Sequence, residues 1–212
     1  MFARTLSDSA QAALALLGKS GCVKDAYLAG GSALALYYGH RLSVDFDFFS
    51  QKSFVPSDLD EILKRVGTFQ KTFAQGITLM GEFQGIKFSY FQYSYPLIAN
   101  VTPFLAVNIA HPHDIAAMKL VAITDRSTKK DFVDLYELTK QGISLDQMFE
   151  LYEQKYHALT ENVFTLIRAL RYFDEIEKST MPDMLIPRTW EEIEQFFITE
   201  SVRLAKKYLE ET

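Results

Sequence analysis

A short apolar run that ends at two glycines, followed by a helical pattern and a second extended run, constrains this chain more than any other feature. Residues 27–29 are apolar, and the sequence Gly-Gly-Ser follows at 30–32. A helical pattern covers 33–38, and after a Gly-His-Arg turn the residues at 43–49 read Ser-Val-Asp-Phe-Asp-Phe-Phe. The order strand, glycine turn, helix, strand predicts that the first part of the chain mixes helices with a sheet.

The second run carries two aspartates, Asp45 and Asp47, which we expect on one face because side chains at i and i+2 of a strand point the same way. Phe46 and Phe48 then form a core-facing pair on the other face. Two like charges on one face are unfavourable unless a cation lies between them, and a divalent cation accepts carboxylate oxygens while keeping positions open for phosphate. The spacing therefore predicts a metal-binding pair, against the plainer reading of a solvent-facing pair on an edge strand.

The glycine turn predicts a phosphate cradle. Gly30 and Gly31 let the backbone turn tightly and approach a ligand closely, and Ser32 is expected to open a helix whose N-terminal amides favour an anion. An ordinary Gly-Gly turn is the alternative. A cradle followed about a dozen residues later by a metal-binding pair favours the functional reading of both halves.

The same residues resemble those of a known superfamily. Gly-(Gly/Ser)-Ser followed by Asp-x-Asp is the signature of nucleotidyltransferases with the polymerase-beta-like fold. The fuller string Leu-Ala-Gly-Gly-Ser-Ala-Leu-Ala-Leu, then Gly-His-Arg, then Ser-Val-Asp-Phe-Asp-Phe-Phe, is similar to the AbiEii/AbiGii toxins of bacterial type IV toxin–antitoxin and abortive-infection systems. The resemblance implies Mg²⁺-dependent transfer of a nucleoside monophosphate from an NTP to a hydroxyl of tRNA or protein, and a cognate winged-helix antitoxin regulator.

A second group of charged residues lies farther along the chain. Lys119 is the only charged residue between Asp114 and Asp125 in a helical, largely apolar run, and Arg126 follows two turns after it. Spacing alone does not decide between a site and a plainer reading. In the plainer reading, Lys119 extends along apolar neighbours to reach water, and the later charges form a solvated helix face.

The family resemblance favours a site. Asp-Ile-Ala-Ala-Met-Lys at 114–119, Arg126, and Lys-Asp-Phe-Val-Asp-Leu at 130–135 are similar to the second landmark of the toxin family. The resemblance implies that Lys119, Arg126 and Lys130 neutralise charge on the transferring group and bind nucleotide, and that the two landmarks act in one cleft.

One expected residue is missing. Nucleotidyltransferases of this fold usually contribute a third carboxylate from a later strand, and the expected strand at 85–93 contains neither Asp nor Glu. Glu82 lies one strand earlier, and Asp131 or Asp134 could enter from the helical part. We expect Asp131 to supply the carboxylate, either as the base for the attacking hydroxyl or by orienting Lys119. A single Mg²⁺, an altered base, or a catalytically degenerate nucleotide- or partner-binding module remain as alternatives.

Other residues give weaker signals. His40 and Arg41, in the turn before the Asp strand, either contact phosphate or are solvated loop residues. The start of a helix explains His111 and His113.

Composition sets the broad class of protein. The 212 residues are 48% hydrophobic and carry a formal charge of −5, which argues against broad coating of nucleic acid by net charge. The single cysteine, Cys22, excludes an intrachain disulfide and a cysteine-based zinc site. Without a signal peptide or membrane-spanning run, we expect a soluble, cytoplasmic bacterial protein with no membrane partner.

The predicted fold class is α+β (mixed α/β). A polymerase-beta-like lobe with a mixed sheet is expected at 1–110, and a helical lobe that completes the site at 111–212. Expected helices cover 9–18, 33–38, 58–66, 114–125, 130–140, 145–156, 161–176 and 190–209, and later strands cover 68–73, 77–83, 86–93 and 104–109.

Overall fold

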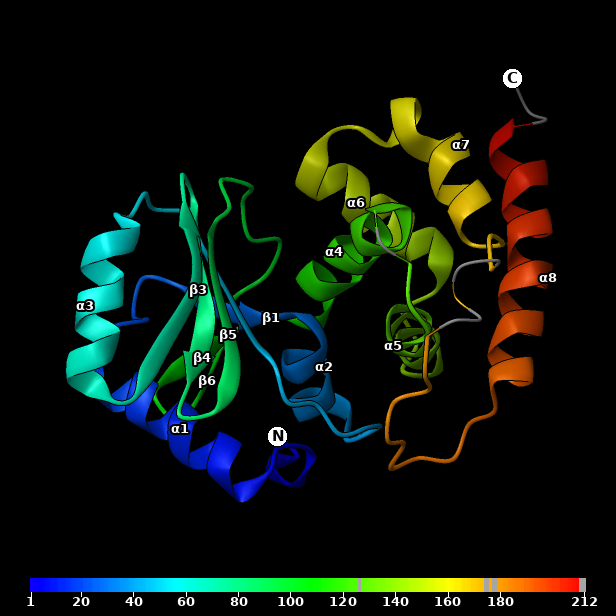
Figure 1. Cartoon of the computed structure of the whole chain (residues 1–212). Helices are drawn as coiled ribbons and strands as arrows, with labels where there is room; N and C mark the ends of the chain where they lie inside the picture. The colour runs from blue at the N-terminus through cyan, green and yellow to red at the C-terminus, as the bar shows by residue number, and fades with distance from the viewer. Residues whose placement is uncertain (126, 174–175, 177–178, 210–212) are drawn as a thin grey trace. The chain divides into compact units, whose positions relative to one another are not determined.

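The computed structural model describes residues 1–125, 127–173, 176 and 179–209. The chain forms two compact units, Met1–His111 and Pro112–Thr212 (Figure 1). This boundary differs by one residue from the division expected at 110 and 111. Whether the second unit completes the site of the first stays a prediction.

Unit 1 contains a seven-stranded mixed sheet with helices that lie against it. Its elements are η1 (Ala3–Thr5), α1 (Asp8–Ser20), β1 (Tyr27–Ala29), α2 (Gly30–Tyr38), β2 (Phe46–Ser50), α3 (Pro56–Val66), β3 (Phe69–Gln75), β4 (Thr78–Phe83), β5 (Ile86–Gln92), β6 (Thr102–Phe104) and β7 (Val107–Ile109).

The motif-bearing strands lie in the middle of the sheet, whose order is β3-β4-β5-β2-β1-β7-β6. β2 pairs in parallel with β5, β1 pairs in parallel with β7, and the other neighbours are antiparallel. Two-residue turns at 76–77 and 84–85 join β3 to β4 and β4 to β5. Gly76 and Gly85 adopt positive φ there, as tight hairpins require. These two glycines therefore set the hairpins.

Two boundary predictions in unit 1 were wrong. The single strand expected at 104–109 is a hairpin, β6–β7, because Leu105 and Ala106 both adopt positive φ and reverse the chain. The first helix does not stop at Gly18 but continues to Ser20, and Gly21 supplies the left-handed cap. A methyl group at Gly18 would lie 2.1 Å from the Leu105 carbonyl oxygen, so this glycine lets the helix pack on the hairpin turn.

One face of the sheet is covered by helices and forms the core of unit 1. Figure 1 shows α3 lying along this face. Apolar residues of α3 at Leu59 and Leu63 are buried, as are Phe83 of β4 and Phe88 of β5. Burial of this aromatic-rich face supplies the hydrophobic stabilisation of the sheet.

Unit 2 is helical. Its helices are α4 (Pro112–Asp125), α5 (Lys129–Lys140), α6 (Leu145–Tyr156), α7 (Leu159–Ala169) and α8 (Trp190–Leu209). The helix expected at 161–176 was wrong at its end, because α7 stops at Ala169. The chain beyond it turns so that Phe173 packs edge-on against Phe132 and Trp190, with ring centroids 5.4 and 5.8 Å away. Burying this ring is the physical reason for the early end.

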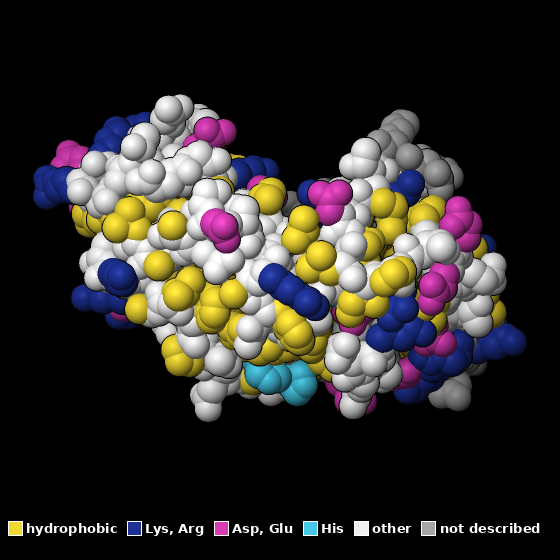
Figure 2. Space-filling model, turned by 90° about the horizontal axis from the view of Figure 1, so that it is seen from below, with side chains coloured by type: hydrophobic (Ala, Val, Ile, Leu, Met, Phe, Trp, Pro, Cys, Tyr) yellow, Lys and Arg dark blue, Asp and Glu magenta, His cyan; other side chains and the backbone are white. Residues whose placement is uncertain are grey.

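Two features of the described residues bear on membrane and nucleic-acid partners. No helix among the described residues is both long and apolar enough to cross a membrane. On the face drawn in Figure 2, Lys and Arg side chains occur in several separate places among other residue types. Broad electrostatic coating of nucleic acid is therefore not favoured by this face either.

Candidate functional site

The Gly-Gly-Ser sequence forms the first turn of α2 instead of a turn before it. β1 ends at Ala29 and the helix begins at the next residue, Gly30, whose φ is +65°. Ala29 is the N-cap residue, and its side chain makes no capping hydrogen bond. The first-turn amides are thus not satisfied by a cap, which is the arrangement that favours an anion at a helix N-terminus.

Gly31 is required by the close approach of a charged side chain, and Gly30 by its positive φ of +65°. A methyl group at Gly30 would lie 3.1 Å from Oδ2 of Asp47, and one at Gly31 would lie 2.0 Å from Nη2 of Arg41. An alanine at Gly31 would therefore collide with the guanidinium group. The two glycines bring a carboxylate and a guanidinium group against the start of α2.

The burial of Arg41 was not predicted from the sequence. A loop arginine is usually solvated, but Arg41 is 3% exposed and the neighbouring His40 is completely buried, so the solvated reading was wrong. Arg41 also donates from Nη1 to the carbonyl oxygen of Leu42 at 3.0 Å. Arginine is almost never fully buried unless it is paired, so nothing in the sequence indicated burial here. The position of Arg41 beside Gly31 is visible only in the tertiary structure.

Ser32 holds the aspartate segment in place. Its hydroxyl donates to the backbone carbonyl of Asp45 and lies 2.9 Å from the hydroxyl of Ser43. Ser32 is 1% exposed, so this hydroxyl group is used inside the protein. The contribution of Ser32 to a phosphate cradle would come from its backbone amide, while the side chain fixes residues 43–45 against α2.

Asp45 and Asp47 follow the predicted alternation. Asp45 directly precedes β2, Asp47 lies within it, and both are half-buried. Phe46 and Phe48, between and after them, are completely buried. The two carboxylates thus occupy the less buried side of the strand, where Asp47 lies opposite Ala29 of β1.

The residues present fit a hard divalent cation. Carboxylate oxygens are the donors that Mg²⁺ prefers, and the absence of a side chain at Gly30 leaves room beside Oδ2 of Asp47. No group of three or more Asp, Glu, His or Cys residues is placed to hold a metal ion together within the described part of the chain. This unit could therefore supply two carboxylates to a divalent cation and leave its other coordination positions open to a substrate.

The parallel pairing shows which residue occupies the place beside Asp47. β5 lies next to β2, and Ser89 is the register partner of Asp47. Ser89 is 2% exposed. The strand expected to carry a third carboxylate thus lies next to the strand of Asp47, with a neutral serine at the position beside it.

In unit 2, Lys119 lies between two carboxylates. Its Nζ is 2.8 Å from Asp131 and 2.6 Å from Asp134, and all three side chains are at most 6% exposed. The hydroxyl of Thr128, which precedes α5, donates to the other oxygen of Asp131 at 2.7 Å. Both oxygens of Asp131 are thus hydrogen-bonded, and one lysine is shared by two acids one helical turn apart.

The other expected residues of this landmark are placed differently. Lys130 is exposed at the start of α5. Arg126 lies outside the described residues. Lys119 and the Asp45–Asp47 pair belong to different units, so the expected common cleft stays a prediction.

Sequence reasoning missed a buried ion pair in unit 2. Lys155 donates to Asp114 at 2.7 Å, and neither side chain is exposed. The available signal was helical spacing, because Lys155 continues the apolar stripe formed in α6 by Met148 and Tyr152. A charge at a core position of a helix requires a buried partner, and the first residue of the second landmark is that partner.

Comparison with known proteins decides the family. Residues 13–99 and 86–207 match the family described as nucleotidyl transferase AbiEii toxin of type IV toxin–antitoxin systems. The chain belongs to the AbiEii nucleotidyltransferase toxin family. An uncharacterized protein of Aquifex aeolicus (strain VF5) is 37% identical to this AbiEii-family chain over 212 residues, which cover 98% of this chain and 99% of the relative.

Solved structures show the fold that this AbiEii-family protein shares. JHP933 from Helicobacter pylori matches with a TM-score of 0.59 and 18% identity, covering 97% of this chain and 96% of that one. A second H. pylori structure, described as a candidate nucleotidyltransferase, matches with a TM-score of 0.55 and 17% identity, covering 97% and 99%. The mixed α/β nucleotidyltransferase fold expected from the motifs is thus confirmed.

Proposed function

We propose that this protein transfers a nucleoside monophosphate from an NTP to an acceptor hydroxyl and releases pyrophosphate, as the toxin of a type IV toxin–antitoxin or abortive-infection system. The observation that carries the proposal is the first turn of α2, where uncapped amides stand beside the carboxylate of Asp47 and the guanidinium of Arg41. Amides and guanidinium suit phosphate, and the carboxylate suits a cation bound to phosphate.

In this proposal the backbone amides of Gly31 and Ser32 bind the outer phosphates. Arg41 adds positive charge beside the same turn, while Ser32 keeps residues 43–45 in register with it. Asp45 and Asp47 would hold Mg²⁺, which neutralises phosphate charge when bound. These groups position the α-phosphorus for attack and stabilise the charge that moves to the leaving pyrophosphate.

The chemical step forms a bond between the acceptor oxygen and the α-phosphorus and breaks the bond to pyrophosphate. The proton of the attacking hydroxyl passes to a base. Lys119, Arg126 and Lys130 are proposed to neutralise charge on the transferring group. Because Asp131 is bonded to Lys119 and Thr128, its geometry favours orientation of the lysine over direct proton abstraction.

The acceptor is proposed to be a tRNA or protein hydroxyl, and a winged-helix regulator is the proposed cognate antitoxin. The test is incubation of purified protein with each of the four α-labelled NTPs, Mg²⁺ and a cell extract. We expect label in an RNase-sensitive or protease-sensitive product. Asp45→Asn should abolish it, while Asp183→Asn, which removes an exposed loop carboxylate, should not.

A second candidate is a nucleotide- or partner-binding module of the same fold without turnover. Ser89 beside Asp47, in place of a carboxylate, is the observation that favours it. This candidate predicts Mg²⁺-dependent NTP binding by calorimetry with no transfer of label from any NTP. Transfer by the wild-type protein that is lost in Asp45→Asn excludes it.

A further inference from the structure

The sheet face that carries the two aspartates also carries alternate residues of β5. Paired residues of neighbouring strands point to the same face, and the register pairs Phe46 with Phe88 and Asp47 with Ser89. Asp45 directly precedes Phe46 and Lys87 directly precedes Phe88, so the same register, continued one residue before the start of β2, sets Lys87 beside Asp45. The row next to the expected third-carboxylate position therefore contains a lysine.

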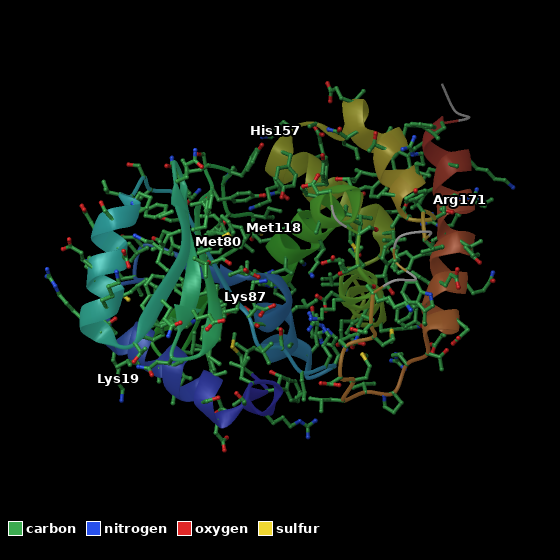
Figure 3. The ribbon with its side chains drawn as sticks, in the orientation of Figure 1. Lys19, Met80, Lys87, Met118, His157 and Arg171 are labelled. Atoms are coloured by element: carbon green, nitrogen blue, oxygen red, sulfur yellow. The ribbon has the colours of Figure 1, made fainter. Side chains whose placement is uncertain are left out.

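Lys87 is available to a ligand. Its side chain is exposed, and no ion pair or hydrogen bond joins it to another described residue. Figure 3 places it, with Met80 of β4, on the side of the sheet away from α3. Several other lysines differ in this respect, because Lys52 and Lys71 are paired with Asp25 and Asp60 at 2.6 and 2.9 Å.

Charge and spacing indicate what this amine would contact. Neighbouring strands lie roughly 4.8 Å apart, so a lysine on the strand next to Asp45 reaches the space above that carboxylate. A cation held there by Asp45 and Asp47 would bring phosphate oxygens to the same space. An ammonium group is a compact point charge with three donors, which suits phosphate.

We propose that Lys87 is a nucleotide-binding residue whose ammonium group contacts the phosphates of the NTP. This inference rests on the proposed function. Lys87 supplies positive charge on the strand where a third carboxylate was expected. A third carboxylate would help to bind a second cation, and that cation would neutralise phosphate charge. In its absence, the ammonium group of Lys87 neutralises part of that charge instead.

The competing explanation is a cross-strand charge pair. Glu82 of β4 is the register partner of Lys87, and opposite charges in that position stabilise a sheet weakly. If that were the only role of Lys87, its removal would lower stability slightly and leave nucleotide binding unchanged. Removal of Glu82 would then have the same effect as removal of Lys87.

The experiment compares Lys87→Gln, Lys87→Arg, Glu82→Gln and Lys19→Gln. Lys19, labelled in Figure 3, is an exposed lysine of α1 and controls for the loss of one positive charge.

Affinity for a non-hydrolysable NTP analogue with Mg²⁺ is measured by calorimetry, and KM and kcat by label transfer. We expect Lys87→Gln to weaken binding and raise KM about tenfold, with a shallower salt dependence. Lys87→Arg should retain most of the affinity, and the two other variants should match wild type.

Each outcome assigns a cause. If wild type transfers label and Lys87→Gln binds the analogue as tightly as Lys19→Gln, the inference is wrong and the proposed function stands. If Glu82→Gln weakens binding as much as Lys87→Gln, the lysine acts through the sheet and the inference is again wrong. If wild type neither binds nor transfers any NTP, the proposed function and the inference fall together.

Discussion

Lys155 and Asp114 form a completely buried ion pair, with 2.7 Å between Nζ and Oδ1. The pair joins the last turn of α6 to the first turn of α4. Lys119 lies five residues after Asp114 on the same helix, so the pair fixes the position of the helix that presents Lys119. A buried pair in this place links the stability of unit 2 to the geometry of its charged cluster.

Removal of one partner should be strongly destabilising, because the other charge would remain buried and lose its ion pair. Lys155→Met is expected to lower the free energy of unfolding by about 3–5 kcal/mol, measured by urea denaturation. Lys206→Met removes an exposed lysine of α8 and should cost less than about 0.5 kcal/mol. The double variant Asp114→Leu with Lys155→Met should lose less than the sum of the single changes. Strict additivity would contradict a direct coupling of the two side chains.

The sequence was sufficient to predict the parts of the fold that depend on local pattern. Alternation of Asp and Phe around Asp47 predicted the face of β2 to which each side chain points, and the helical periods predicted α4, α5 and α6 closely. These predictions succeeded because periodicity and turn residues act over a few positions.

Tertiary relationships could not be read in the same way. The burial of Arg41 against Gly31 joins residues ten positions apart through the packing of a turn on a helix. The hairpin at Leu105 and Ala106 uses positive φ in residues without a glycine signal, and Gly18 serves close packing instead of a helix stop. Only the assembled unit shows that Ser89 is the residue of β5 that stands beside Asp47.

Gly31→Ala tests the close contact at the start of α2. The added methyl group would meet Nη2 of Arg41 at 2.0 Å, so either the guanidinium group or the helix start must move. We expect NTP affinity, measured by calorimetry with Mg²⁺, to fall about tenfold or more. The free energy of unfolding should fall by about 1–3 kcal/mol. Adding Arg41→Met removes the collision and should restore part of the lost stability without restoring affinity. Wild-type affinity in Gly31→Ala would mean that this turn does not bind phosphate.

Asp146 should give unit 2 a dependence on acid. Partial burial alone would raise the pKa of the Asp146 carboxyl, but hydrogen bonds from Arg203 and Lys207 outweigh it and hold the pKa below its ordinary value. A carboxyl with a depressed folded-state pKa stabilises the protein above its unfolded pKa, near 4, and loses this contribution as pH falls through the folded value. Asp146→Asn should therefore be less stable than wild type at pH 7, by about 1 kcal/mol after allowance for solvent screening.

The difference in stability between wild type and Asp146→Asn should shrink below about pH 4 and vanish once the folded-state carboxyl is protonated. Urea denaturation at a series of pH values measures it. Asp183→Asn, at an exposed loop carboxyl, is the control and should show no such trend. A difference that stays constant down to pH 2 would show that the ion pairs to Arg203 and Lys207 do not lower the free energy of the folded state.

The shared lysine of unit 2 allows the role of Asp131 to be tested. Asparagine at this position keeps an oxygen that accepts from Lys119 but removes the negative charge, while Asp134 still pairs with the lysine at 2.6 Å. If Asp131 orients Lys119, Asp131→Asn should weaken NTP affinity and rate together, by about tenfold in kcat/KM, and Asp134→Asn should behave similarly. If Asp131 is the base, Asp131→Asn should abolish transfer with NTP and Mg²⁺ affinity nearly intact, and Asp134→Asn should retain activity. The bonds from Lys119 and Thr128 to both oxygens of Asp131 favour the first result. Wild-type transfer in Asp131→Asn would exclude both roles.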